Sequence, residues 1–423
     1  MAGTRLSGVR AAAGPVLLGI ANLHSHAFQR AFAGLPRVRA AGDDSFWSWR
    51  ATMSRWPVIT PETLEAIATW LFVEMLEGGF TSVCEFHYLH HDERGRPYAD
   101  PDTLAQCIAR AATRTGIGLT LLPVLYQQGG FGAPPTAGQR RFVQSTDALL
   151  SMVTRLSADT TIPRVGMALH SLRAVSPDAL RDAVPGVATI DRTAPIHIHV
   201  AEQMREVEEC VAWSGQPPVS WLVDHVPVSL RWCLVHATHM TLDETRLAAG
   251  AGAVAGLCPT TEANLGDGEF GMHEWLAHGG RWGVGSDSHV TVNAAEELRL
   301  LEYSQRLASR RRNVVASEAI PHVGTALTLG AVAGGAAASG RPVGGLAPGH
   351  RADLVVLDGA HPALDGLDAP LTLDAHVFAS HRRSTIARVV VGGRTVVEDG
   401  VHPLRAEAGE AFVLARARVL AGA

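Results

Sequence analysis

Short apolar runs rich in branched side chains alternate with segments of helical periodicity, and this alternation constrains the fold more than any other feature of the chain. Helices are predicted between the runs, for example at Asp102–Arg114 and at Pro177–Ala183, where Ser176 is the expected N-cap. Alternating strands and helices form a parallel sheet, and eight such units close into a barrel. We therefore expect an α/β protein built on a (β/α)8 TIM-type barrel. Its predicted strands are Val16–Asn22, Thr81–Phe86, Gly118–Leu125, Val165–Leu169, Pro195–Val200, Trp232–Val235, Ala253–Cys258 and Arg281–Gly285.

The alternation stops near residue 340. A turn followed by a strand is predicted within Leu346–Asp358, and Arg388–Val391 and Arg394–Val397 form a predicted hairpin around two glycines. These strands indicate a small β-sandwich-like second domain. We expect residues 1–15 to be a short N-terminal remnant of that domain, residues 16–340 to form the catalytic barrel, and residues 341–423 to supply the C-terminal strands of the small domain.

Charge and residue usage exclude several classes of chemistry. The net charge is −5, so nothing predicts a nucleic-acid or anionic-membrane partner. All 36 basic residues are arginine, which excludes a Schiff-base lysine, a P-loop lysine and a carboxylated lysine that bridges two metal ions. The 5 cysteines stand singly, without a CxxC pair, which argues against a zinc ribbon or a disulfide framework and favours a reducing, cytoplasmic location. The apolar stretch Ala11–Ala21 is better explained as part of a buried first strand than as a signal peptide.

A set of metal-binding residue types falls at the carboxyl ends of the predicted strands. His24 and His26 end the first strand on one face, His199 lies on the fifth, and Asp287 follows the eighth. An HxH pair alone could equally be two hydrogen-bonded surface histidines. Three imidazoles and one carboxylate from separate strand ends, however, form a ligand set for one divalent ion, with Zn²⁺ favoured. Such an ion lowers the pKa of a bound water molecule and makes it a nucleophile.

Two further residues have the chemistry of proton transfer rather than of ligation. Glu202 comes three residues after His199 and can pass a proton between water and a leaving nitrogen, although it could instead be a loop carboxylate paired with Arg205. His236 directly follows the sixth apolar run and can donate to a developing anion. We favour His236 over His239 for that role. We expect Asp287 to act in catalysis as well as in ligation, because a carboxylate beside the water can take its proton.

The order of these motifs resembles the mononuclear deaminase branch of the amidohydrolase superfamily. The likeness is closest to the formimidoylglutamate (N-formimino-L-glutamate) deiminase family and runs from about residue 14 to residue 400. Members of that family usually carry more chain before the HxH motif than this sequence does. The stretches that carry the resemblance are Asn22–Arg30, Asp44–Arg50, Glu85–Tyr88, His170–Val175, His197–Gln203, Thr261–Gly268 and Gly285–His289.

The resemblance implies an activity and a set of substrate contacts. The family hydrolyses N-formimino-L-glutamate to N-formyl-L-glutamate and ammonia in histidine degradation. The dicarboxylate needs a cationic partner, and Arg173 is well suited because a guanidinium can bind a carboxylate with two hydrogen bonds, although it could be an ion pair at the barrel rim. Gln29, Tyr88 and His170 match substrate contacts of the family. Arg50 matches a residue that reaches the neighbouring subunit's site, which implies a homodimer, although it could instead be a helix-surface arginine.

Two other functions remain open at this stage. The same catalytic residues could act on a nucleobase or related heterocycle, as in guanine, cytosine or S-adenosylhomocysteine-type deaminases, or in chlorohydrolases. Those pockets would favour aromatic stacking, whereas His170-Ser-Leu-Arg173 favours an acidic, acyclic substrate. A non-catalytic barrel that serves only as a scaffold is the second alternative, and it should have lost at least one ligand or the proton shuttle.

Overall fold

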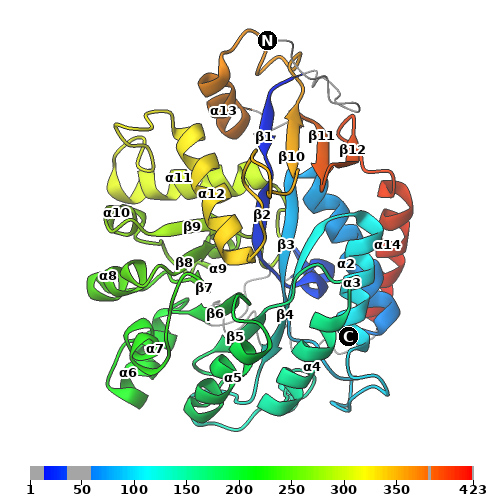
Figure 1. Cartoon of the computed structure of the whole chain (residues 1–423), viewed down its shortest axis with the longest axis vertical. Helices are drawn as coiled ribbons and strands as arrows, with labels where there is room; N and C mark the ends of the chain where they lie inside the picture. Colours follow the sequence, from blue (N-terminus) through cyan, green and yellow to red (C-terminus); the bar gives the residue numbers. More distant parts are fainter. Residues whose placement is uncertain (1–13, 36–58, 380–382, 422–423) are drawn as a thin grey trace.

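A computed structural model describes residues 14–35, 59–379 and 383–421, and its centre is a barrel of parallel strands (Figure 1). The sheet has 8 strands in the sequential order β2 to β9. Its two ends meet where Ser25 forms a bridge to Asp287 and the Asp287 amide donates to the His24 carbonyl at 3.0 Å. The predicted barrel is confirmed. Its strands are β2 (Ile20–Ser25), β3 (Phe80–His87), β4 (Gly118–Leu125), β5 (Met167–Ser171), β6 (Ile196–Val200), β7 (Trp232–His236), β8 (Val254–Leu257) and β9 (Arg281–Val284).

Helices surround the barrel, as crossover connections between parallel strands require. The helix predicted at Asp102–Arg114 is α3, and the one predicted at Pro177–Ala183 is α5, where the Ser176 hydroxyl accepts from the Ala179 amide at 3.2 Å. The helices of this part are α2 (Pro61–Glu77), α3 (Thr103–Thr115), α4 (Thr146–Ala158), α5 (Pro177–Ile190), α6 (Met204–Ser214), α7 (Pro218–His225), α8 (Leu242–Gly250), α9 (Pro259–Leu265), α10 (Met272–Ala277), α11 (Ala294–Ser309) and α12 (Val323–Ser339), with the 3-10 turns η1 (Ala27–Phe32) and η2 (Ala137–Gln139).

A separate antiparallel sheet of 4 strands lies at one end of the barrel in Figure 1. Its order is β1 (Val16–Leu18), β10 (Leu354–Leu357), β11 (Ile386–Val391) and β12 (Arg394–Glu398). The predicted β11–β12 hairpin is present, and Gly392 and Gly393 have φ values of 57° and 80°, as a tight two-residue hairpin turn requires. The single strand predicted at Val16–Asn22 is instead two strands, because the chain turns at Gly19 and its first part, β1, pairs with β10 of the small sheet.

The chain after residue 340 also contains helices that the expectation of strands alone missed, namely α13 (Ala369–Phe378) and α14 (Arg405–Ala421). Helix α14 lies along α2 (Figure 1), where Phe412 stacks on Trp70 with ring centroids 6.0 Å apart. Its buried residues Ala408, Phe412, Ala415 and Val419 recur every three or four positions. That helical spacing is visible in the sequence, but it is weak because two of the four buried residues are alanine.

Close packing of α12 closes one end of the barrel. A side chain at Gly334 would meet the Trp282 carbonyl oxygen at 1.8 Å, so only glycine allows α12 to approach β9 this closely. At the end of α12 the carbonyls of Ala338 and Ser339 accept hydrogen bonds from His197 and Thr120 of the barrel. The helix therefore fills the amino-terminal end of the barrel and leaves the carboxyl end for the site.

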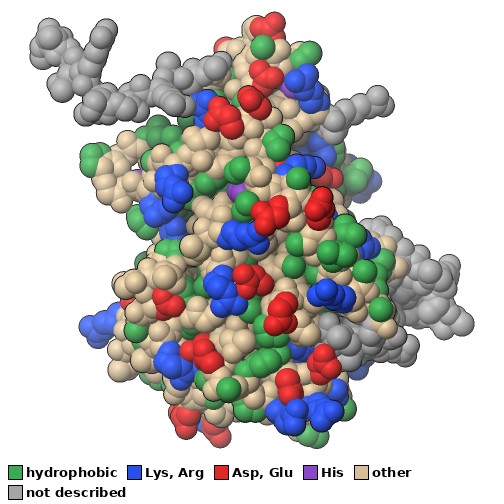
Figure 2. All heavy atoms as spheres, turned by 90° about the vertical axis from the view of Figure 1, so that its right-hand side faces the viewer, with side chains coloured by type: hydrophobic (Ala, Val, Ile, Leu, Met, Phe, Trp, Pro, Cys, Tyr) green, Lys and Arg blue, Asp and Glu red, His purple; other side chains and the backbone are tan. Residues whose placement is uncertain are grey.

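The outer surface carries mixed charge. On the face shown in Figure 2, basic and acidic side chains are interspersed with apolar ones. The surface also carries exposed ion pairs such as Arg114–Glu407. A nucleic-acid partner would instead require basic side chains gathered on one surface. Within the described residues, no helix combines the length and the apolar character needed to cross a bilayer.

Candidate active site and metal centre

The four predicted metal ligands meet at the carboxyl end of the barrel. His24 belongs to β2 and His199 to β6, while His26 directly follows β2 and Asp287 is the third residue after β9. A side chain at Gly285 would meet the His24 amide nitrogen at 2.7 Å, so glycine at this position lets the end of β9 pass close to β2 and brings Asp287 to the histidines. All four side chains are buried.

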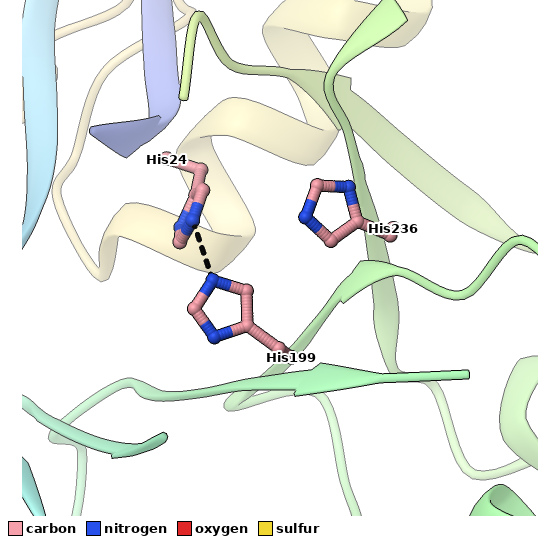
Figure 3. A group of neighbouring side chains, drawn as sticks. All are labelled: His24, His199 and His236. Atoms are coloured by element: carbon pink, nitrogen blue, oxygen red, sulfur yellow. Dashed lines mark hydrogen bonds between the residues drawn. The ribbon is translucent and has the colours of Figure 1, made fainter. Parts of the chain in front are cut away.

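The distances between these side chains suit a single ion. Oδ1 of Asp287 lies 3.4 Å from Nε2 of His24 and 3.4 Å from Nε2 of His26. Nε2 of His199 lies 2.9 Å from Nε2 of His24, as the dashed line in Figure 3 marks. With metal–ligand distances of ~2.1 Å, neighbouring ligand atoms in a tetrahedral site stand roughly 3.4 Å apart. The spacing therefore fits the predicted set.

Backbone carbonyls fix which nitrogen of two ligand histidines faces the centre. Nδ1 of His26 donates to the Phe86 carbonyl at 3.0 Å, and Nδ1 of His199 donates to the His170 carbonyl at 2.8 Å. Since neutral imidazole has one proton, each Nε2 is left with a lone pair directed inward. Burial, and then the neighbouring histidines, hold the pKa of His24 and His199 well below the usual range. Neutral imidazoles with converging lone pairs are the form that a divalent cation binds.

His236 and Glu202, the two residues predicted to move protons, lie next to each other. Nε2 of His236 lies 3.6 Å from Oε1 of Glu202 and 3.9 Å from Oδ2 of Asp287. In Figure 3 the His236 ring lies across from the His24–His199 pair. Arg205 pairs with Glu209 at 2.7 Å, so the alternative reading of Glu202 as the partner of Arg205 is not supported.

Burial and neighbouring charges raise the pKa values of both Glu202 and His236. Burial raises the pKa of Glu202 to about 7, which makes it able both to accept and to release a proton near neutral pH. Burial lowers the pKa of His236, but the carboxylates of Glu202, Asp287 and Glu262 outweigh it and raise the value to about 10. These carboxylates therefore favour the protonated form of the His236 ring.

Backbone strain gathers at the same strand ends. His236 has a φ of 67° and Asp287 a φ of 44°, and Ala201 and Ala237 are also in the left-handed region. Non-glycine residues adopt this conformation at a cost, and such residues concentrate at functional sites. The strained turns direct His236 and Asp287 inward where the strands end.

A polar pocket opens beside the candidate metal centre. The space within it, including its open mouth, is about 460 Å³. Nε2 of Gln29 donates to the Tyr88 hydroxyl at 3.0 Å, and the buried Arg173 lies 3.9 Å from Glu202 rather than at an exposed rim. Arg50 falls outside the described residues. The pocket lining is His26, Gln29, Tyr88, His170, Arg173, His199, Glu202, His236, Leu265 and Asp287.

The sequence did not predict roles for two acidic residues beside this pair. Oε1 of Glu262 accepts from Nδ1 of His236 at 3.2 Å, which leaves Nε2 directed at the pocket. Asp267 is buried beside Glu202 and His236, and burial, followed by the charge of Glu202, raises its pKa to about 9. Both residues occur in the Thr261–Gly268 stretch noted for its resemblance, but an isolated carboxylate within a short helix (Glu262) or just after it (Asp267) carries no spacing signal.

The sequence was compared with models of known protein families. Residues 16–396 match the model described as the amidohydrolase family. The chain belongs to the amidohydrolase family. This amidohydrolase is 50% identical over 404 residues to formimidoylglutamate deiminase from Pseudomonas aeruginosa, an alignment that covers 95% of this chain and 88% of the relative.

Solved structures agree with the family assignment. A crystal structure of an amidohydrolase from Brucella melitensis has a TM-score of 0.90 and 49% identity, and covers 96% of this chain and 90% of that one. A zinc-complexed atrazine chlorohydrolase from Arthrobacter aurescens has a TM-score of 0.80 but only 22% identity, over 96% of this chain and 88% of that one. The second likeness concerns the fold alone.

Proposed function

We propose that this amidohydrolase hydrolyses N-formimino-L-glutamate to N-formyl-L-glutamate and ammonia, a step of histidine degradation. The observation that carries the proposal is the 50% identity to a formimidoylglutamate deiminase over nearly the whole chain. The site supports it independently, because a buried cationic Arg173 shares one small pocket with the Glu202–His236 pair. A substrate with carboxylates at one end and a hydrolysable C–N bond at the other matches that pairing.

One divalent ion, with Zn²⁺ favoured, is part of the proposal. His24, His26, His199 and Asp287 would hold it, and their converging Nε2 lone pairs and buried carboxylate support that choice. When bound, the ion supplies Lewis acidity that activates a water molecule and polarises the carbon under attack.

The chain's own groups would then move the protons. Oε1 of Glu202 accepts a proton from the attacking water and delivers it to the departing nitrogen, for which a pKa near 7 is well matched. Nε2–H of His236 donates to the negative charge that develops on the attacked centre. Asp287 accepts the remaining proton of the water as the C–N bond breaks and passes it on, so that the nitrogen leaves as ammonia. Arg173 binds a substrate carboxylate, and Gln29, Tyr88 and His170 orient the chain between the two ends.

The alternative of a heterocycle deaminase or chlorohydrolase receives less support. An aromatic ring would need flat apolar walls, whereas Tyr88 and Leu265 are the only non-histidine apolar or aromatic residues among the described residues that line the pocket. The chlorohydrolase likeness is at 22% identity, far below that of the deiminase. A non-catalytic scaffold is disfavoured because the predicted ligands and the Glu202–His236 pair converge.

An ammonia-release assay tests the function directly. Purified protein should release ammonia from N-formimino-L-glutamate, and Glu202→Gln should abolish turnover while leaving Zn²⁺ binding intact. Guanine, cytosine and S-adenosylhomocysteine are the comparison substrates. Faster ammonia release from any of these than from N-formimino-L-glutamate would reject the proposed substrate but retain the chemistry.

The proposal also covers the oligomeric state and the cellular location of the protein. We propose a cytoplasmic homodimer in which Arg50 of one subunit contributes to the site of the other. The 5 cysteines are all free, which suits a reducing compartment. Mixing an Arg50→Ala variant with an inactive Glu202→Gln variant tests sharing, because hybrid dimers should recover activity only if Arg50 acts across the interface.

A further inference from the structure

A buried carboxylate lies directly beneath the HxH motif, and the chemistry proposed above does not use it. Glu85 on β3 is almost completely buried, at 2% exposure, and in the described part of the chain it has no cationic partner. Burial raises its pKa to about 8. An acidic group buried without a counter-charge is costly, so its presence calls for an explanation.

Both oxygens of Glu85 bind the chain on either side of a metal ligand. Oε2 accepts from the Ser25 hydroxyl at 2.5 Å, and Oε1 accepts from the Ala27 amide at 2.7 Å. Ser25 stands between His24 and His26, and Ala27 follows His26. The carboxylate thus holds one side chain and one backbone amide of the short segment that carries both imidazoles.

The hydrogen bonds continue from Ser25 to the opposite side of the site. Ser25 Oγ lies 3.3 Å from Nε2 of His289, whose Nδ1 lies 2.9 Å from Ser286 Oγ. Asn22 Nδ2 donates to the same Ser286 hydroxyl at 2.6 Å. If each hydroxyl donates once, the bonds run in one direction, from Asn22 through Ser286, His289 and Ser25 to Glu85. Ser286 immediately precedes Asp287, so this network connects the histidine and aspartate segments.

We propose that Glu85 is a positioning residue for the metal site, which fixes the separation of His24 and His26 through Ser25 and Ala27 and so sets metal affinity. The inference rests on the proposed metal site. Such supporting contacts around metal ligands typically change metal affinity 10- to 100-fold when they are removed, roughly the effect we expect here.

Metal affinity, measured by competition with a chromophoric chelator, tests this without reference to turnover. Glu85→Ala and Ser25→Ala should each weaken Zn²⁺ binding by about 10- to 100-fold. The double variant should be little worse than either single variant, because both remove the same contact. Glu85→Gln keeps the side-chain volume and should weaken binding in the same direction if Glu85→Ala does not fold.

Ser82→Ala is the matched control, since Ser82 is buried on the same strand and its hydroxyl has no hydrogen-bond partner among the described residues. It should bind Zn²⁺ as the wild type does. The absorption spectrum of bound Co²⁺ reports ligand geometry and should change in Ser25→Ala but not in Ser82→Ala. Wild-type affinity in both Ser25→Ala and Glu85→Gln, or fully additive effects, would overturn the inference alone. A wild-type protein that binds no divalent ion would overturn the proposed function as well.

Discussion

Nδ1 of His236 lies 3.2 Å from a carboxylate oxygen of Glu262, and both side chains are buried. The same Glu262 oxygen accepts from the Cys258 amide at 2.8 Å, so the carboxylate is held in place at the end of β8. This contact determines which nitrogen of His236 faces the pocket and helps to keep the ring protonated. The orientation of the proposed donor therefore depends on a residue of α9, the helix that follows the next strand.

Glu262→Gln should lower kcat by about 10²-fold with a smaller change in KM, because the pKa of His236 falls and the ring can rotate. Steady-state kinetics on N-formimino-L-glutamate measure the effect. Zn²⁺ content should stay at the wild-type level, and the exposed Glu208→Gln on α6 is the control. An unchanged kcat in Glu262→Gln would mean that His236 does not act as a charged donor.

Arg173→Met should weaken binding of dicarboxylates selectively. Loss of a buried guanidinium that binds a carboxylate costs a few kcal/mol, so the inhibition constant of glutarate should rise roughly 10²-fold. Butyrate, which has one carboxylate, tests whether the loss is specific to a charged end. Equal weakening of both inhibitors in Arg173→Met would argue for general distortion of the pocket rather than for carboxylate recognition.

Removal of the ion should abolish turnover and reduce stability together. Chelation should eliminate ammonia release, and Zn²⁺ should restore it at roughly one ion per chain, as one open catalytic site requires. Free Zn²⁺ at a hundred times its dissociation constant should add about 2.7 kcal/mol to the free energy of unfolding. His199→Ala should lose both effects in a thermal-unfolding titration; if Zn²⁺ still raises the melting temperature of that variant, the ion binds elsewhere.

Acid should destabilise the fold through buried histidines outside the ligand set. Burial lowers the pKa of His87 to about 4, so the folded protein keeps this ring neutral where the unfolded chain, with a value near 6.5, takes up a proton. Its contribution, up to about 3 kcal/mol, is present above pH 6.5 and is lost as the pH falls toward 4.

Urea unfolding at a series of pH values checks this sign. His87→Leu should flatten the dependence of the unfolding free energy on pH between 6.5 and 4, because an apolar side chain does not bind a proton. The exposed His278→Leu is the control and should leave the slope unchanged. An equal slope in wild type and His87→Leu would show that other groups dominate acid unfolding.

Local patterns in the sequence were sufficient to predict the barrel and the reactive residues at the carboxyl ends of its strands. Each strand is a short apolar run, and parallel strands expose their carboxyl ends at one edge, so His24, His199 and Asp287 could be assigned to one place before any coordinates were known. The helix α14 and the division of the first strand into β1 and β2 were harder to predict from sequence. The position of α14 depends on its packing against α2, and β1 forms because it pairs with β10.

Hydrogen-bond partners that come from other strands could be decided only by the folded chain. Glu262 and Glu85 lie 26 and 60 residues from the side chains they hold, and nothing in the local sequence distinguishes them from other carboxylates. The residue types of a strand determine which end of the barrel its reactive side chain lies at. The tautomer, the pKa and the direction of that side chain are set by neighbours brought within 3 to 4 Å when the barrel closes, because electrostatic and hydrogen-bonding forces act over those distances and not along the chain.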